Sequence, residues 1–303
     1  MIDEVGGRWG RVIGVKRDST ESDCGILEVG IAVDAGLRWA AADFTQVIES
    51  ARRRLDLSPL AAAALGRGLT GAALLLRLYH KTTMKLLLDI RGDGPLGRIL
   101  AEVDSDGRLR GTVQKPKTDL PATDDGKLAV GRGVGAGTLR VRREFSEGSY
   151  ESEVELVTGE IGDDLAHFLT QSEQTRAAVL LGVLATPEGV SGAGGAIIEA
   201  LPDAEEEALG RVEENLSKVS KVSRLIAQSG TAGLMDPVLE GLDGRVLESR
   251  EFCYRCRCTR ERIARHLAAL PAFERRTLGQ EDGVISAECV FCGDQYRFAP
   301  SEL

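Results

Sequence analysis

The stretch that decides how this chain is organised is Cys253-Tyr-Arg-Cys-Arg-Cys258, which is followed thirty residues later by Cys289-Val-Phe-Cys292. Five of the six cysteines therefore lie close to the C-terminus, and only Cys24 lies elsewhere. Two close cysteine pairs about thirty residues apart are typical of a tetrahedral Cys₄ zinc site, because four thiolates at about 2.3 Å satisfy the ion without any redox change. The sequence predicts a small metal-bound unit over residues 249–303, with plain buried cysteines or an iron–sulfur centre as alternatives.

Spacing alone leaves the ligand set open. The pair Cys256-x-Cys258 can be combined with Cys289 and Cys292, but so can Cys253-x-x-Cys256. The second choice gives an ordinary zinc ribbon and leaves Cys258 spare, and spacing alone favours it because the CxxC knuckle is the commoner motif. Cys24 precedes an apolar strand, so we expect it to be buried and inert.

A helical connector is predicted upstream of this unit, over residues 203–248. Pro202 ends the preceding block, and the acidic residues 203–207 suit the first turn of a helix. Apolar residues then recur at steps of three or four, which predicts one amphipathic helix of about six turns. We call them the connector stripe: Leu209, Val212, Leu216, Val219, Val222, Leu225 and Ile226. Such a stripe either packs permanently in a core or covers a surface from which it can be released.

Residues 21–202 read as one α/β or α+β domain, preceded by a Gly- and charge-rich extension at 1–20. Helices are predicted over Thr45–Leu55, from Pro59 to about Tyr79 and over Asp163–Ser172, and the second of these is apolar nearly all round, so it should be buried. Strands are predicted over Gly25–Val33, Gly36–Ala42, Met84–Ile90, Gly97–Val103, Leu109–Val113, Leu128–Val130, Thr138–Arg143 and Tyr150–Val157, with the apolar runs Ala177–Leu184 and Ala196–Leu201 completing the sheet.

Composition excludes several classes of function. A net charge of −9 and only 4% aromatic residues argue against a nucleic-acid-binding protein. No apolar run reaches the eighteen or so residues of a membrane helix, and the N-terminus lacks a signal pattern, so we expect a cytoplasmic protein. The Gly-rich segment Gly131–Gly137 leads into a predicted strand, whereas a dinucleotide loop opens a helix, so we expect no nucleotide.

The residues around the cysteines resemble a known family. Tyr254-Arg-Cys-Arg-Cys-Thr-Arg-Glu-Arg262 and Cys289-Val-Phe-Cys-Gly-Asp-Gln-Tyr-Arg-Phe298 look like the C-terminal signature of the redox-regulated heat-shock chaperones of about thirty-three kilodaltons. The resemblance extends over about residues 22–303, through Ser58–Lys81, Gly92–Gly97, Gly107–Gly111, Val157–Leu165, Ser172–Gln174, Ala193–Ile198 and Leu201-Pro202.

This resemblance implies that one zinc ion is bound by Cys256, Cys258, Cys289 and Cys292. It also implies an ATP-independent holding chaperone for unfolding proteins, inactive while reduced and zinc-bound, and dimeric when oxidised. Oxidation would pair near neighbours, Cys256 with Cys258 and Cys289 with Cys292, and release the ion. Thr259 in place of the usual serine, the N-terminal extension and the additional thiol of Cys253 depart from the family pattern.

Energetics favour a switch at such a site. A unit of about 55 residues rarely obtains more than about 3–5 kcal/mol from its core, whereas a structural zinc contributes roughly 10–16 kcal/mol in small peptides. The tail should therefore unfold when zinc leaves, and the released connector stripe would expose apolar surface. Five nearby arginines could offset the charge of the thiolates or form a solvated helix face: Arg255, Arg257, Arg260, Arg262 and Arg265.

Two other functions remain as rivals. A thiol–disulfide oxidoreductase would use Cys289-x-x-Cys292, but Gly293-Asp294 argues against the helix that such a motif normally opens. A zinc-ribbon adaptor would bind nucleic acid or a protein, but eight arginines against eight acidic residues in 251–303 leave the tail neutral. We expect a chaperone and no enzymatic activity.

Overall fold

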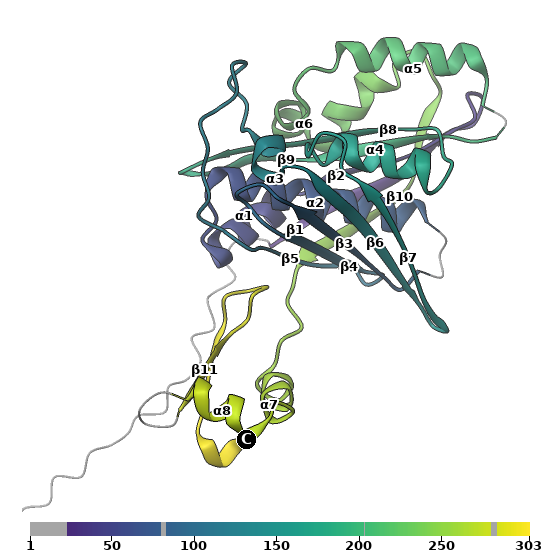
Figure 1. Ribbon diagram of the computed structural model, residues 1–303. Helices are drawn as coiled ribbons and strands as arrows, with labels where there is room; N and C mark the ends of the chain where they lie inside the picture. The colour runs from purple at the N-terminus through teal and green to yellow at the C-terminus, as the bar shows by residue number, and fades with distance from the viewer. Residues whose placement is uncertain (1–22, 80–82, 203, 280–283) are drawn as a thin grey trace, which may run out of the picture.

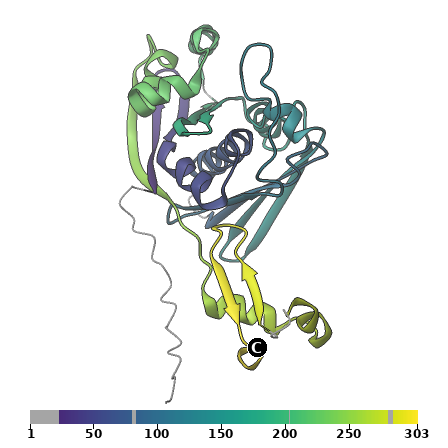
Figure 2. The ribbon, with the colours of Figure 1, turned by 90° about the vertical axis from the view of Figure 1, so that its left-hand side faces the viewer.

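A strongly curved ten-stranded sheet wraps around one long helix and forms the main body of the protein (Figures 1 and 2). The computed structural model describes residues 23–79, 83–202, 204–279 and 284–303, so the extension predicted at 1–20 lies outside the described residues. The strand order is β7-β6-β3-β4-β5-β10-β1-β2-β9-β8. The predicted class, an α/β core with helices and a C-terminal cysteine module, is confirmed.

The sheet follows most of the predicted apolar runs. Its strands are β1 (Cys24–Ala32), β2 (Leu37–Asp43), β3 (Lys85–Gly92), β4 (Ile99–Asp104), β5 (Arg108–Val113), β6 (Gly137–Phe145), β7 (Gly148–Glu155), β8 (Ala177–Thr186), β9 (Gly189–Ala200) and β10 (Gly244–Tyr254). Gly36, with φ of +62°, closes the predicted turn between β1 and β2. Only the β5–β10 contact is parallel among the ladders of this sheet within the described residues.

The helix at the centre is α2 (Pro59–Leu78), which begins where the sequence places it. The Ser58 hydroxyl caps it by accepting a hydrogen bond from the Ala61 N–H at 3.1 Å, with Pro59 in the first turn. By length and composition α2 could cross a membrane, but 89% of its apolar window is buried inside the protein. It is therefore the core helix of the domain, flanked by α1 (Thr45–Leu55) and α4 (Gly162–Gln171).

The strand predicted over Leu128–Val130 is wrong, because this segment leads into a short helix, α3 (Val130–Val134). Winding into a turn brings the carbonyls of the segment to the backbone N–H groups of a neighbouring loop. The Val134 carbonyl accepts from Gly94 at 2.8 Å, and the Gly133 carbonyl accepts from Leu96 at 2.9 Å.

Strand β10 lies in the middle of the sheet, between β5 and β1, although it comes late in the sequence. It pairs with β1 along its whole length, from Cys24 opposite Cys253 to Ala32 opposite Gly244. The predicted boundary between connector and tail, at 248/249, lies within β10, which runs across it without a break. The core sheet is thus completed by a strand that leads directly into the cysteine module.

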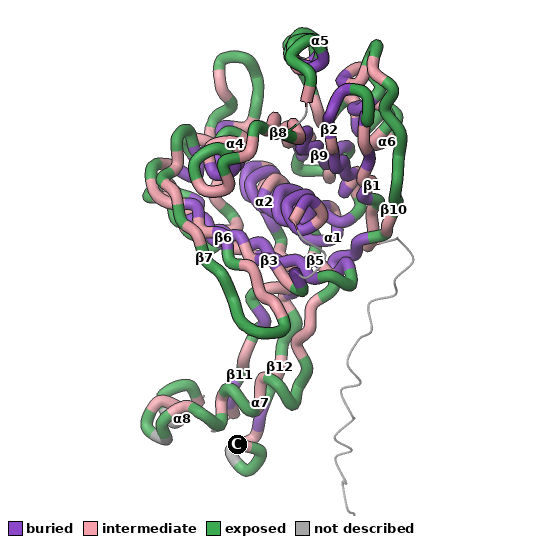
Figure 3. Tube along the Cα trace, turned by 90° about the vertical axis from the view of Figure 1, so that its right-hand side faces the viewer, coloured by how far each residue is buried: buried purple, intermediate pink, exposed green. Residues whose placement is uncertain are grey.

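The connector forms two helices, α5 (Glu206–Lys218) and α6 (Val222–Val238), so the prediction of one continuous helix is wrong. The break at 219–221 lets α6 lie on the outer face of β9 and β2 with α5 against it (Figure 1). Asn215 fixes the fold-back, since its side-chain amide donates to the carbonyls of Val238 at 3.1 Å and Glu240 at 3.0 Å. Figure 3 shows α2 buried at the centre and α5 exposed along most of its length.

The C-terminal module extends away from the sheet at the end of β10 (Figure 1). It contains α7 (Arg260–Ala268), α8 (Ala272–Leu278) and the hairpin of β11 (Ile285–Glu288) and β12 (Gln295–Phe298). In Figure 2 the turn of this hairpin points toward the main body. The module therefore meets the core through two segments, the end of β10 and the β11–β12 turn.

Candidate metal centre

Four cysteine sulfurs converge where these two segments meet. Cys256 and Cys258 follow β10, and Cys289 and Cys292 lie in the β11–β12 turn. All four sulfur atoms lie within 4.8 Å of one another. The Cys256 and Cys289 sulfurs are 3.6 Å apart, and those of Cys258 and Cys292 are 3.2 Å apart. The structure thus brings together the four cysteines that the resemblance indicated.

These distances fit a four-coordinate thiophilic ion. A regular tetrahedron with metal–sulfur bonds of about 2.3 Å has sulfur–sulfur edges of about 3.8 Å, close to the spacing of the four thiols. Cys289 and Cys292 are buried and the other two are half-buried, as expected of a closed structural site. The cluster can therefore hold a metal ion without rearrangement of the backbone.

The cluster favours thiolate at one sulfur. Hydrogen bonds from Cys289 and Cys292 lower the pKa of Cys256 far below that of a free thiol. The same contacts raise the pKa of Cys289 to about 11 and raise that of Cys292 further. A cation bound at the centre of the cluster would stabilise every sulfur as thiolate.

Arg110 on β5 is a site residue that sequence reasoning missed. Burial lowers its pKa, but hydrogen bonds and charge from Glu102 and Cys256 outweigh burial and raise it. Its guanidinium also stacks 4.5 Å from the centre of the Phe291 ring, which lies between Cys289 and Cys292. The core therefore supplies the positive charge beside the cluster. In the sequence, Arg110 lies within the segment Gly107–Gly111, which resembles the family. No spacing rule connects a side chain of this segment with the cysteines of the tail.

The five arginines singled out in the tail do not act as one group. Arg257 turns toward the core and pairs with Glu102 at 2.9 Å and Asp104 at 3.2 Å. Arg260 pairs with Glu302 at 2.7 Å and stacks 4.5 Å from the ring centre of Phe298. Arg255 is exposed, as are Arg262 and Arg265. Arg257 is thus a docking contact between module and core.

Substituting Arg257 by alanine is expected to loosen the module while leaving its metal site intact. Glu102 and Asp104 are both nearly buried, so loss of their partner removes a charge-assisted contact. Because Arg257 is partly exposed, we expect amide exchange in residues 256–268 to rise only about five- to tenfold. Hydrogen-exchange mass spectrometry checks this, with the exposed Arg255→Ala as the matched control. Equal protection in both variants would contradict a docking role.

Two further contacts seat the module. The buried Tyr254 hydroxyl lies 2.6 Å from the Phe291 carbonyl and 3.1 Å from the Gly111 carbonyl, so it joins the cysteine turn to β5. Gly293 has φ of +72°, and a Cβ there would lie 2.6 Å from the Arg54 carbonyl at the end of α1. The turn that carries Cys292 therefore rests directly on the core.

The expectation that Cys24 is inert is wrong. Cys24 is half-buried and forms a disulfide with Cys253, its direct partner across the β1–β10 ladder. The prediction failed because the partner comes from a strand more than two hundred positions later, and β10 was not predicted as a strand. The sulfur of Cys253 is thereby engaged outside the cluster.

The connector stripe packs on the outer face of the sheet. Val212 and Ile226 are buried in a second apolar cluster with Trp39, Ala41 and Ile198, and the other five stripe residues pack against this cluster. Side chains alternate along β2, so Ala40 and Ala42 face α2 while Trp39 and Ala41 face the connector. Release of α5 and α6 would therefore uncover an apolar face of the sheet as well as the stripe.

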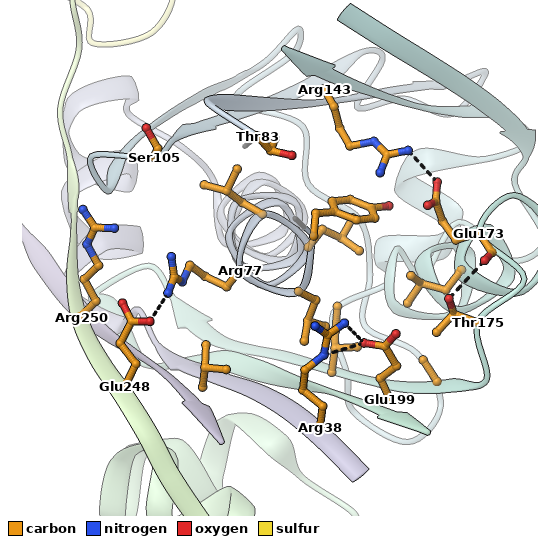
Figure 4. A pocket seen from close by; sticks show the side chains of 18 of the residues that line it. Arg38, Arg77, Thr83, Ser105, Arg143, Glu173, Thr175, Glu199, Glu248 and Arg250 are labelled. Atoms are coloured by element: carbon orange, nitrogen blue, oxygen red, sulfur yellow. Dashed lines mark hydrogen bonds and ion pairs between the residues drawn. The ribbon is translucent and has the colours of Figure 1, made fainter. Parts of the chain in front are cut away.

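A cavity of about 1400 Å³ opens beside the C-terminal end of α2 (Figure 4). Its wall is partly apolar, with Leu75, Leu76 and Leu247 among the lining residues. Three ion pairs line it: Arg38 with Glu199, Arg77 with Glu248, and Arg143 with Glu173. Because Leu247 and Glu248 belong to β10, displacement of this strand would open the cavity further.

The fold and the site together define a class: a wrapped-sheet domain that carries a small four-cysteine module able to hold a metal ion. The family model described as "Hsp33 protein" matches residues 27–299. The chain is 43% identical over 286 residues to a 33 kDa chaperonin of Thermus thermophilus, covering 90% of this chain and 84% of the relative.

It is also 43% identical over 277 residues to the 33 kDa chaperonin of Symbiobacterium thermophilum, covering 90% and 94% of the two chains. The crystal structure of the 33 kDa chaperonin of Thermotoga maritima superposes with a TM-score of 0.85 at 32% identity, covering 92% of this chain and 96% of that one. The chain belongs to the Hsp33 family and is a chaperone of the Hsp33 type.

Proposed function

We propose that this protein is a redox-regulated, ATP-independent holding chaperone whose inactive state is maintained by one zinc ion bound to Cys256, Cys258, Cys289 and Cys292. The observation that carries the proposal is the convergence of these four sulfurs, within 4.8 Å of one another, at the seat of the module on the core. Bound zinc would keep all four sulfurs as thiolates, the form that attacks oxidants.

Oxidation would then separate the two halves of the module. Two molecules of hydrogen peroxide accept four electrons from the four thiolates and four protons from solvent, the two O–O bonds break to give four molecules of water, and two S–S bonds form. We propose that sequence neighbours pair, Cys256 with Cys258 and Cys289 with Cys292. Neither bond joins the β10 side of the module to the β11–β12 side, so the unit loses the link that stabilised it.

Unfolding of the module would remove the contacts that seat it on the core, including those of Arg257 and Tyr254. The connector leads directly into β10. Loss of the contacts that hold the C-terminal end of β10 therefore favours release of α5 and α6. The connector stripe, the sheet face beneath it and the cavity beside β10 then offer apolar surface to unfolding proteins. We propose that the same apolar surface mediates dimerisation of the oxidised form.

We infer a cytoplasmic location, where thiols are kept reduced until oxidant appears, and no enzymatic, nucleotide-binding or nucleic-acid-binding role. Cys289-x-x-Cys292 lies in the turn between β11 and β12 instead of opening a helix, which disfavours a thioredoxin-like oxidoreductase. No turnover of insulin disulfides is expected in a reductase assay.

The test is a paired measurement on purified protein before and after peroxide at elevated temperature. Suppression of citrate-synthase aggregation should rise as one zinc per chain is released. Disulfide mapping by mass spectrometry should find the two neighbour pairs. Equal holding activity in both states, or cross-linked pairs such as Cys256 with Cys289 that keep the two halves joined, would contradict the proposal.

A further inference from the structure

Cys24 and Cys253 form a second pair of sulfurs, outside the four-cysteine cluster. They are opposite residues of the β1–β10 ladder, and their sulfurs are joined while the four sulfurs of the cluster remain free thiols. Only Tyr254 and Arg255 separate Cys253 from the first cysteine of the cluster. One cysteine of the disulfide and two cysteines of the cluster therefore lie within six residues on the same segment of chain, 253–258.

The pair lies at the point where β10 is most firmly held. The residues Phe252, Cys253 and Tyr254 are buried, whereas the beginning of β10 at 244–249 is exposed. Phe252 contacts the ring of Phe44 with 5.9 Å between ring centres. The disulfide thus reinforces the anchored end of the strand, between the module that would unfold and the connector that would be released.

We propose that Cys24 and Cys253 are a second redox pair, whose disulfide tethers β10 to β1 and limits how far the connector leaves the core. The step is balanced by a peroxide: the two thiols lose two electrons and two protons, one S–S bond forms, and the O–O bond breaks to give two molecules of water. The half-buried Cys24 offers the accessible sulfur for this reaction. The inference rests on the proposed release of the connector.

The tether changes the topology of the released chain. Without the disulfide, everything after β9 is attached to the core at one end only once β10 has left β1. With it, the connector is a loop held at Ala200 and at Cys253, while the module beyond Cys253 is still free to unfold. Closing a loop of this length reduces the entropy of its unfolded ensemble and shifts the equilibrium toward docking by about a hundredfold or more. Oxidation of Cys24 and Cys253 therefore favours docking of the connector, whereas oxidation of the cluster favours its release.

The experiment compares full-length wild type with Cys24→Ser, both loaded with zinc and then oxidised with peroxide in the presence of a chelator. Hydrogen-exchange mass spectrometry follows residues 204–252. We expect exchange to be about a hundredfold faster in Cys24→Ser than in wild type, and Cys253→Ser to match it. A serine variant can fold poorly, so a second comparison uses wild type alone. Its cluster is emptied by chelator at low pH, and the protein is then reduced with dithiothreitol, which removes the disulfide without a substitution.

The outcomes separate the tether from the switch. Faster exchange in the variants and in reduced wild type supports the tether. Exchange that rises equally in wild type and variants on zinc removal overturns the tether and leaves the proposed release standing. If exchange rises neither in wild type nor in the variants, both the tether and the proposed release of the connector are overturned. Two titratable thiols in denatured, peroxide-treated protein, mapped to Cys24 and Cys253, would also overturn the second redox pair.

Discussion

Replacing Cys292 by serine is expected to abolish zinc binding and to unfold the module after β10. A neutral hydroxyl cannot replace a thiolate in the ligand set, and the module has few buried apolar residues of its own. A structural zinc is worth roughly 10–16 kcal/mol, against about 3–5 kcal/mol from a core of this size, so the folded module cannot persist without the ion. Metal analysis should fall from one zinc per chain to none, and amides at 256–302 should lose protection.

The matched controls are serine substitutions at the two cysteines outside the cluster. Cys24→Ser and Cys253→Ser should each retain one zinc per chain, whereas Cys258→Ser should lose it. The reverse result, with zinc lost in Cys253→Ser and kept in Cys258→Ser, would establish the zinc-ribbon ligand set instead. A Cys292→Ser protein that keeps both zinc and a protected tail would refute the role assigned to the ion.

Replacing Ile226 by aspartate is expected to produce a chaperone that holds clients without oxidant. Ile226 is 2% exposed and packs in the cluster between the connector and the sheet. Losing its side chain costs about 2–5 kcal/mol, and burying a carboxylate there adds to this cost. The core around α2 is a separate cluster, so the main domain should remain folded. Aggregation of a thermally unfolding client should be suppressed by the reduced, zinc-bound variant.

Gln228→Asp is the control for this experiment, since it introduces the same charge into the same helix at an exposed position. It should require peroxide for activity, as is expected of wild type. Zinc content should stay at one per chain in both variants, which separates connector release from loss of the metal. An Ile226→Asp protein with exchange-protected connector helices and no activity in the reduced state would contradict the assignment of the connector as the released surface.

The parts of the fold that could be predicted are those whose signals are local. The Ser58-Pro59 cap and the apolar composition of α2 define its start and its burial, and Gly36 marks the first hairpin. β10 was missed because its first residues are exposed and do not alternate between polar and apolar side chains. Its pairing with β1 is a long-range property that no local pattern reports. The break between α5 and α6 was missed since the apolar spacing continues through it.

The cysteines of the site could be predicted from the sequence, but the core residues that surround them could not. Four thiols at characteristic spacings indicate a metal by chemistry alone. Arg110, Glu102 and Tyr254 bring the core to the cluster from β5, β4 and β10, and only the folded sheet places them there. The Cys24–Cys253 bond escaped prediction for the same reason, because it depends on strand register.

The central position of β10 has a consequence for biosynthesis. A ribosome delivers the strands on either side of it, β1 and β5, long before residues 244–254 emerge. Until then both neighbours present unpaired backbone edges, which are templates for aggregation. The nascent domain closes only in the last stage of translation, a few seconds before the second cysteine pair appears at about 5–20 residues per second. Completion of the sheet and completion of the four-cysteine cluster are therefore nearly simultaneous events in the life of each molecule.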